Sequence, residues 1–277
     1  MHRSRFITVL LIISMLFSLA SCGGNQQQEE TIKVGMECNY APFNWTQSNE
    51  TATSVPIDSV PGAYADGYDV QMARKIAEGL GKKLVIVKLE WDGLTPALVA
   101  GEIDLIIAGM SPTAERKLTI DFTDAYYASE LVVVVRKDSQ YAGADSLDDF
   151  AGAVITGQLN TVHYDVIDQM DGVTKENAME TFPAMIVALT SGKIDGYISE
   201  LPGAVSAAAA NSDLTYVRFA EGQGFVAAEE DITVAVGVRK GETDLVNNIN
   251  DILAGISGDE RQQMMQDAVS NQPLSDM

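Results

Sequence analysis

The chain has 277 residues, with 39 acidic against 18 basic side chains and a formal net charge of −21 at pH 7. A surface this acidic repels phosphate backbones, which argues against nucleic-acid binding. It also disfavours an anionic small molecule unless a basic residue offsets the field locally. The length suffices for one large or two modest domains with cores of their own.

Residues 1–22 follow the pattern of an export signal. Arg3 and Arg5 give a positive start, Phe6–Ala20 is apolar apart from three hydroxyl residues, and two small residues precede Cys22. The apolar stretch is shorter than the roughly 20 residues that a membrane span needs. The end of the segment resembles a lipobox, at which bacterial lipoproteins are cut and diacylated. We therefore expect lipid on Cys22; an ordinary signal peptide with a chance cysteine is the alternative.

Residues 23–30 contain only Gly, Asn, Gln and Glu. Such a segment buries no apolar surface and is typical of a flexible tether, so structure should begin near Thr31. If Cys22 carries lipid, Cys38 has no cysteine partner, and stability must come from hydrophobic cores. The mature chain is then expected outside the cytoplasm, held to the cell membrane by its lipid.

From Thr31 onwards, short apolar runs alternate with segments of helical period, which predicts an α/β fold with mostly parallel sheets covered by helices. The predicted strands are Ile32–Val34, Leu84–Val87, Ile103–Ala108, Leu131–Val135, Ala153–Thr156, Ile194–Ile198, Leu214–Phe219 and Ile232–Val238. The predicted helices are Tyr68–Leu80, Asp92–Ala100, Val162–Gln169, Ala184–Thr190, Pro202–Ala210, Asp244–Leu253 and Asp259–Val269.

One internal similarity predicts two lobes of similar build. Residues 97–104 (ALVAGEID) resemble residues 188–195 (ALTSGKID), close to half the mature length further along. In each segment a helix ends at a glycine suited to a left-handed C-cap, and a buried strand follows. Chance similarity, or one sheet that uses the same turn twice, is the alternative.

The same similarity predicts where a ligand binds. Ligands of open α/β sheets bind beyond the carboxyl ends of the strands. In the first segment that end is Ala108–Ser111, and in the second it is Ser199–Glu200. If the two lobes face each other, these loops line one cleft.

Several motifs together carry a family resemblance. They are Gly35–Phe43 (GMECNYAPF), Gly67–Val70 (GYDV), Ile103–Arg116 (IDLIIAGMSPTAER) and Ile120–Tyr127 (IDFTDAYY). In this order and spacing the chain resembles family 3 of the bacterial extracellular solute-binding proteins, which bind polar amino acids for ABC importers. The resemblance implies a periplasmic-binding-protein type II fold, with two α/β lobes joined by two hinge strands. It places residues 31–128 and 232–277 in lobe 1 and residues 129–231 in lobe 2.

A closed cleft must pair both charges of a free amino acid. Arg116 suits the carboxylate, because a guanidinium offers a planar fork of constant charge. Ser111 and the backbone around Ala108 and Gly109 would complete the cradle, and the resemblance implies that role for the arginine and the hydroxyl. The alternative for Arg116 is a surface salt bridge to a neighbouring acid. By the same resemblance Glu200 binds the ammonium; its alternative is an acid at a helix N-terminus.

The remaining predicted contacts surround the ligand's side chain. Tyr40 and Trp91 match aromatic positions that enclose it in the family, and flat rings bury apolar stems and attract cations. Trp91 has an alternative role in packing the start of a helix. Gln158 and Thr161 belong to a lobe-2 loop in which Asn160 replaces the family's glycine; asparagine tolerates left-handed backbone.

Glu37 matches the family's acidic position that reaches a cationic side chain. With Trp91 it favours an arginine- or lysine-like ligand; glutamine or another polar amino acid is the alternative, and Glu37 solvated or paired internally stays open. No cofactor or metal is expected. The expected partners are the membrane subunits of an ABC permease, and the chain is expected to be a monomer. Residues 46–65 look like an insertion that forms a surface hairpin.

Two other function classes stay open. Some dehydratases share the fold, so a cyclohexadienyl-dehydratase-like enzyme is one alternative. Against it, His163 is the one histidine after the leader. It has no cysteine or metal-ligand spacing around it, so we interpret it as structural. The other alternative is a sensing adaptor that binds the same ligand and signals through a receptor.

Overall fold

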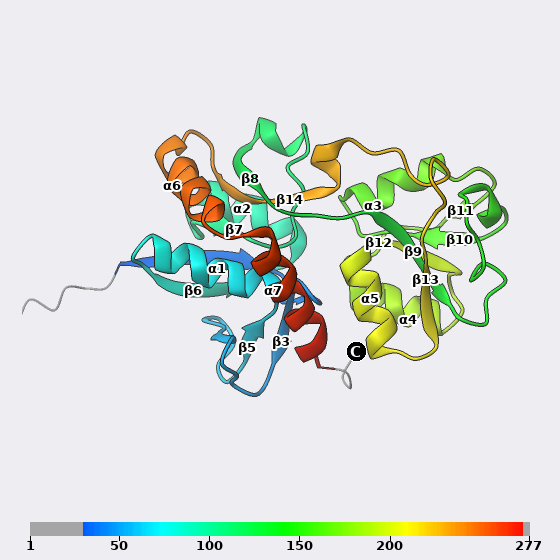
Figure 1. Ribbon diagram of the computed structural model, residues 1–277, viewed down its shortest axis with the longest axis horizontal. Coiled ribbons are helices and arrows are strands. Elements are labelled where there is room, and N and C mark those ends of the chain that lie inside the picture. Colours follow the sequence, from blue (N-terminus) through cyan, green and yellow to red (C-terminus); the bar gives the residue numbers. More distant parts are fainter. Residues whose placement is uncertain (1–29, 274–277) are drawn as a thin grey trace, which may run out of the picture.

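The computed structural model describes residues 30–273, and the predicted leader with Cys22 and the tether up to residue 29 lie outside this range. Two α/β lobes lie side by side and are joined by extended segments along one edge (Figure 1). The predicted two-lobed α/β architecture is confirmed. Between residues 30 and 273 no helix has the length and apolar character required to traverse a bilayer.

Lobe 1 is built on a five-stranded sheet in the order β6-β1-β7-β14-β8. Its strands are β1 (Thr31–Met36), β6 (Lys83–Lys88), β7 (Leu105–Ile106), β8 (Ile120–Ala128) and β14 (Thr233–Arg239). Its helices are α1 (Tyr68–Gly79), α2 (Trp91–Ala100), α6 (Thr243–Ala254) and α7 (Gly258–Asn271), with a short 3-10 helix, η1 (Arg116–Leu118).

Lobe 2 has a five-stranded sheet in the order β11-β10-β12-β9-β13. Its strands are β9 (Leu131–Arg136), β10 (Val154–Thr156), β11 (Thr174–Lys175), β12 (Gly196–Glu200) and β13 (Leu214–Val217). Its helices are α3 (Val162–Asp165), α4 (Phe182–Thr190) and α5 (Leu201–Ala210). The 3-10 helices are η2 (Asp148–Phe150), η3 (Val166–Gln169) and η4 (Glu229–Asp231).

Each sheet is mixed, where the sequence led us to expect mostly parallel pairing. In lobe 1, β1 runs parallel to β6 and β7, and β14 runs antiparallel to β7 and β8. In lobe 2, β10 runs parallel to β11 and β12, and β9 runs antiparallel to β12 and β13. The antiparallel strands, β9 and β14, are the ones that begin at the junction between the lobes. Each therefore runs through its sheet in the direction opposite to the parallel strands.

The chain passes between the lobes twice. It first leaves β8 at Ala128 and enters β9 at Leu131, and it returns before β14. The backbone N–H of Ser129 donates to the carbonyl of Ile232 at 3.0 Å, so the two crossings are hydrogen-bonded to each other. Strand β8 was not predicted, because its residues do not alternate between buried and exposed positions as those of a typical half-buried strand do.

Residues 46–65 take part in a small antiparallel sheet on lobe 1, in the order β2-β3-β5-β4. Its strands are β2 (Asn39–Tyr40), β3 (Asn44–Gln47), β4 (Val55–Pro56) and β5 (Tyr64–Asp66). Pairing of Ile57 with Ile86 joins this sheet to the main one. The segment is a hairpin, as expected, and it packs against the main lobe-1 core.

The internal similarity is a structural unit present once in each lobe. Helix α2 is followed by Gly101 at φ 78° and helix α4 by Gly192 at φ 76°, both in the left-handed region that favours glycine. Three residues after each glycine, an aspartate accepts a backbone N–H from the neighbouring parallel strand at 2.9 Å; these residues are Asp104 and Asp195.

An arginine completes each unit from the antiparallel strand. At the end of β14, Arg239 donates to the carbonyl of Ile103 at 2.7 Å and pairs with Asp104 at 3.4 Å. At the end of β9, Arg136 donates to the carbonyl of Ile194 at 2.8 Å and pairs with Asp195 at 3.4 Å. We call these groups the lobe-1 and lobe-2 arginine clamps.

The paired clamps predict equivalent losses of stability. Arg239→Met and Arg136→Met each remove the arginine donor from a buried carbonyl and from a carboxylate, so each should lower the free energy of unfolding by about 1–3 kcal/mol. Lys193→Met, at an exposed pair with 4.0 Å between the charged atoms, should change it by less than about 0.5 kcal/mol. Urea denaturation followed by circular dichroism measures all three. A clamp variant as stable as Lys193→Met would show that its clamp does not stabilise the fold, and unequal losses in the two clamp variants would contradict their equivalence.

Candidate ligand-binding site

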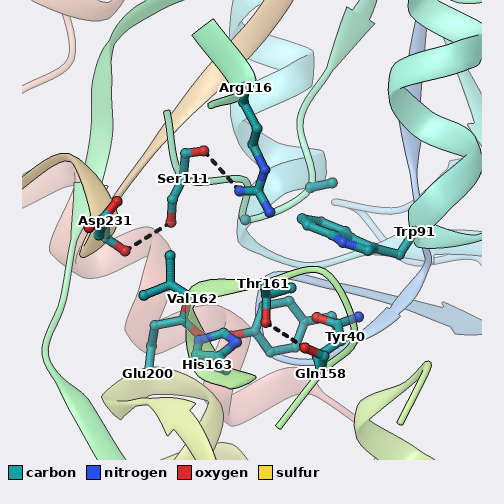
Figure 2. Close-up of a pocket in the computed structure, with 12 residues that line it drawn as sticks. Tyr40, Trp91, Ser111, Arg116, Gln158, Thr161, Val162, His163, Glu200 and Asp231 are labelled. Carbon is teal, nitrogen blue, oxygen red and sulfur yellow. Dashed lines mark hydrogen bonds and ion pairs between the residues drawn. The ribbon is translucent and has the colours of Figure 1, made fainter. Parts of the chain in front are cut away.

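The cleft between the lobes is lined from both sides (Figure 2). Figure 2 shows Arg116 and Trp91 on one side of a cavity, and Glu200, His163 and Gln158 on the other. The cavity is small, ≈ 20 Å³, which is room for about one water molecule. An amino acid can therefore enter only if the lobes or their side chains move apart. The cavity is lined by Tyr40, Trp91, Ala108, Gly109, Ser111, Arg116, Gln158, Thr161, Val162, His163, Glu200 and Asp231.

Of the residues predicted to bind a ligand, the structure brings all except Glu37 to the wall of this cavity. Glu37 is hydrogen-bonded to Gln158, which does line the cavity. Sequence reasoning missed three lining residues, Val162, His163 and Asp231. The first two follow Thr161 directly, so their position in that loop was a usable signal; Asp231, in η4, had none.

Arg116 lies at the start of η1 and points into the cleft. Its Nη1 donates to the carbonyl of Ser111 at 2.9 Å, and its Nη2 crosses to lobe 2 and donates to the carbonyl of Asn160 at 3.0 Å. The guanidinium carbon lies 5.1 Å from the ring centre of Trp91. Burial lowers the pKa of Arg116, and nearby acids oppose that shift. The alternative of a surface salt bridge does not describe this geometry.

Glu200, at the end of β12, is buried among donors. His163 Nε2 lies 3.0 Å from its Oε2, and the hydroxyl of Tyr40 donates to the same oxygen from lobe 1. Burial acts to raise the pKa of Glu200, but the charge of His163 and the hydrogen bonds from His163 and Tyr40 hold it below its usual range. Burial and the Glu200 charge raise the pKa of Tyr40 well above 10, so its hydroxyl is a neutral donor.

Glu37 is 1% exposed and faces the lobe-2 loop. Gln158 Nε2 donates to its two oxygens at 3.2 and 3.3 Å. Burial raises the pKa of Glu37 to about 7; Gln158 opposes the shift, and the negative charges of Glu90 and Asp92 add to it. Glu37 is therefore paired internally, the possibility that the sequence left open, and its charge changes near neutral pH.

A buried carboxylate, that of Asp69, supports the loop Ala108–Ser111 through hydrogen bonds. The backbone N–H of Gly109 donates to the hydroxyl of Tyr126 at 3.3 Å, and that hydroxyl donates to Asp69 at 2.8 Å. Asn44 donates to the other Asp69 oxygen at 2.8 Å. Burial raises the pKa of Asp69 to about 6 against these hydrogen bonds.

Gly109 itself cannot easily be replaced. Its φ is 62°, and a Cβ at this position would lie 3.1 Å from the Tyr40 ring. The backbone at the cleft is therefore shaped for close approach, which is what a carboxylate held by N–H groups requires.

Asn160 takes the left-handed conformation expected of it, with φ 56°. Its side chain adds a contact that glycine cannot make, donating across the cleft to Asp92 Oδ1 at 2.9 Å. Helix α2 begins at Trp91, so Asp92 lies within its first turn. The hydroxyl of Thr161 donates to the carbonyl of Gln158 at 2.8 Å and closes the loop before α3.

A further contact joins the lobes outside the cleft. Gln272, just after α7, and Ser206 on α5 exchange two hydrogen bonds, and both residues are buried. In the described part of the chain, no group of three or more His, Cys, Asp or Glu side chains is arranged to hold a metal ion.

Comparison with known proteins gives consistent matches. The family model for bacterial extracellular solute-binding proteins, family 3, matches residues 32–269. The arginine-binding extracellular protein ArtP of Bacillus subtilis is 26% identical over 259 residues, covering 90% of this chain and 91% of its own. A probable histidine-binding protein of Campylobacter jejuni is 28% identical over 232 residues, covering 80% and 84%.

Among solved structures, an amino-acid ABC transporter substrate-binding protein from Streptococcus pneumoniae, bound to L-arginine, superposes with a TM-score of 0.73 at 26% identity. The match covers 88% of this chain and 95% of that one.

The raised pKa values of Glu37 (about 7) and Asp69 (about 6) predict how stability depends on pH. Unfolded carboxyl groups titrate near pH 4. Between pH 7.5 and 5.5 the folded chain therefore binds protons that the unfolded chain does not, and stability rises as the pH falls through this window. We expect a higher melting temperature at pH 5.5 than at pH 7.5.

Glu37→Gln should reduce that rise, whereas Glu50→Gln, at an exposed position, should leave it unchanged. Thermal melts of the three proteins at both pH values measure the effect. Identical pH dependence in wild type and Glu37→Gln would show that Glu37 does not titrate in this range.

Proposed function

Because the chain belongs to the bacterial extracellular solute-binding proteins, family 3, we propose that it captures a free, basic amino acid for an ABC importer. The observation that carries the proposal is the pair of opposite charges on one cavity, Arg116 from lobe 1 and Glu200 from lobe 2. A zwitterionic ligand would satisfy both at once, and each contact would draw the lobes together.

The cradle for the ligand carboxylate would consist of the Arg116 guanidinium, the Ser111 hydroxyl and the N–H groups of the loop at Gly109. Tyr40 and Trp91, both on the cavity wall, would enclose the ligand's side chain. Micromolar affinity corresponds to about −8 kcal/mol, which two charge-assisted contacts and aromatic burial can supply.

The preference for a basic ligand rests on Glu37 and Trp91. Near neutral pH a cationic side chain would favour ionised Glu37 and take the place of the Gln158 amide, to which Glu37 is now bonded. Two of the relatives above are described as binding arginine, which supports this choice. Glutamine or another polar amino acid is the alternative ligand.

The rest of the proposal concerns where the protein acts. Lobe 1 would comprise residues 31–128 and 232–277, and lobe 2 residues 129–231, with the crossings near residues 128–131 and 229–232 as hinges. A lipid on Cys22 would hold a monomer at the outer surface of the cell membrane, where the permease's membrane subunits receive the closed form.

A melting screen against the twenty amino acids tests the ligand class. Arginine or lysine should give the largest stabilisation, and a ligand at 100 times its dissociation constant adds about 2.7 kcal/mol. Arg116→Ala should abolish the shift, and the amino acid should be recovered unchanged after binding. No shift with any amino acid would refute the proposal, and turnover of the ligand would favour an enzyme instead.

Cys22→Ser tests the anchor separately. Without the thiol no diacylglycerol can be attached, so the protein should lose labelling by radioactive palmitate. Arg116→Ala should stay labelled. A Cys22→Ser protein that is still labelled would contradict the anchor.

A further inference from the structure

We propose that His163 is a positioning residue for the ligand's α-ammonium, because it contacts the Glu200 carboxylate and orients it toward the cleft. The inference rests on the proposed function, in which Glu200 binds that ammonium. In this inference His163, which we interpreted from the sequence as structural, is part of the binding site.

The geometry around His163 is specific. The residue is on α3 and 6% exposed, and its Nε2 lies 3.0 Å from Glu200 Oε2. The ring of Phe182 meets the imidazole edge-on, with centroids 5.8 Å apart and an interplanar angle of 80°. A Cβ on Gly157 would meet the His163 carbonyl at 2.6 Å, so the backbone is packed closely as well.

The hydrogen bonding separates this residue from a structural histidine. Each ring nitrogen of a histidine can donate or accept a hydrogen bond. Here Nδ1 is buried and finds no partner within residues 30–273, so the hydrogen bonding of the ring is directed at Glu200.

The carboxylate needs such a neighbour. A carboxylate buried without a cation takes up a proton, and a neutral carboxyl group cannot offer an ammonium a full charge. Tyr40 and His163 are the side chains that contact Glu200 Oε2, and their interactions hold the pKa of Glu200 below its usual range against burial. Both partners meet Oε2, so neither of these two side chains occupies the carboxylate's second oxygen.

Isothermal titration calorimetry with three probes tests the contributions of the ligand's carboxylate and α-ammonium to binding separately. The probes are L-arginine, agmatine (arginine without its carboxylate) and δ-guanidinovalerate (arginine without its α-ammonium). His163→Leu should raise the Kd for L-arginine and for agmatine roughly tenfold or more, since both carry the ammonium. It should leave the Kd for δ-guanidinovalerate within about twofold. Arg116→Ala should give the converse, weakening L-arginine and δ-guanidinovalerate and sparing agmatine.

His163→Gln keeps a hydrogen-bond donor with a different geometry and should fall between wild type and His163→Leu for L-arginine. If His163→Leu does not fold, the ratio of the L-arginine and δ-guanidinovalerate dissociation constants in His163→Gln decides in its place. Equal weakening of all three probes, or no weakening, would overturn the inference. Failure of the wild-type protein to bind any amino acid would instead overturn the proposed function, and the inference with it.

Discussion

Burial of the Glu200 carboxylate where two lobes meet is the constraint on which the cleft depends. An ionised carboxylate in that position is destabilising unless donors and a cation surround it. His163 from the same lobe and Tyr40 from the other lobe both contact Glu200 Oε2, and Tyr40 stacks on Phe182 with ring centres 4.0 Å apart. Opening the cleft would separate Tyr40 from Glu200, so the ionisation of one side chain is tied to the relative position of two domains.

The two sides of the cleft differ in how firmly their charges are fixed. Arg116 stays cationic at any physiological pH and holds both Ser111 and Asn160. Glu37, with a pKa of about 7, is only partly ionised at neutral pH. In the proposed function Arg116 would bind the carboxylate that all amino acids share. Glu37 would discriminate between amino acids, because only a cationic side chain is stabilised by an ionised Glu37.

Much of this arrangement was predictable from the sequence. The parts that were not predicted depend on contacts between segments that lie far apart in the chain. The repeated helix–glycine–strand segment identified two lobes, since a left-handed C-cap followed by a buried strand is a local pattern. The Gly67–Val70 motif contributed to the family resemblance, but nothing in it indicated that Asp69 supports the loop at Gly109 through Tyr126. Asp231 joins the cavity only through the return crossing, and the partners of His163 and Gln158 lie on distant segments. Contacts between lobes depend on docking geometry, which no local pattern encodes.

The arginine clamps bear on how the lobes can move. Strands β9 and β14 both leave the junction between the lobes, and each is clamped at its far end, by Arg136 and by Arg239. A strand held at that end is expected to move together with its sheet. Rotation at the crossings would then carry each lobe as a unit, and a rotation of a few degrees there would move the rim of the cleft further than the crossings themselves.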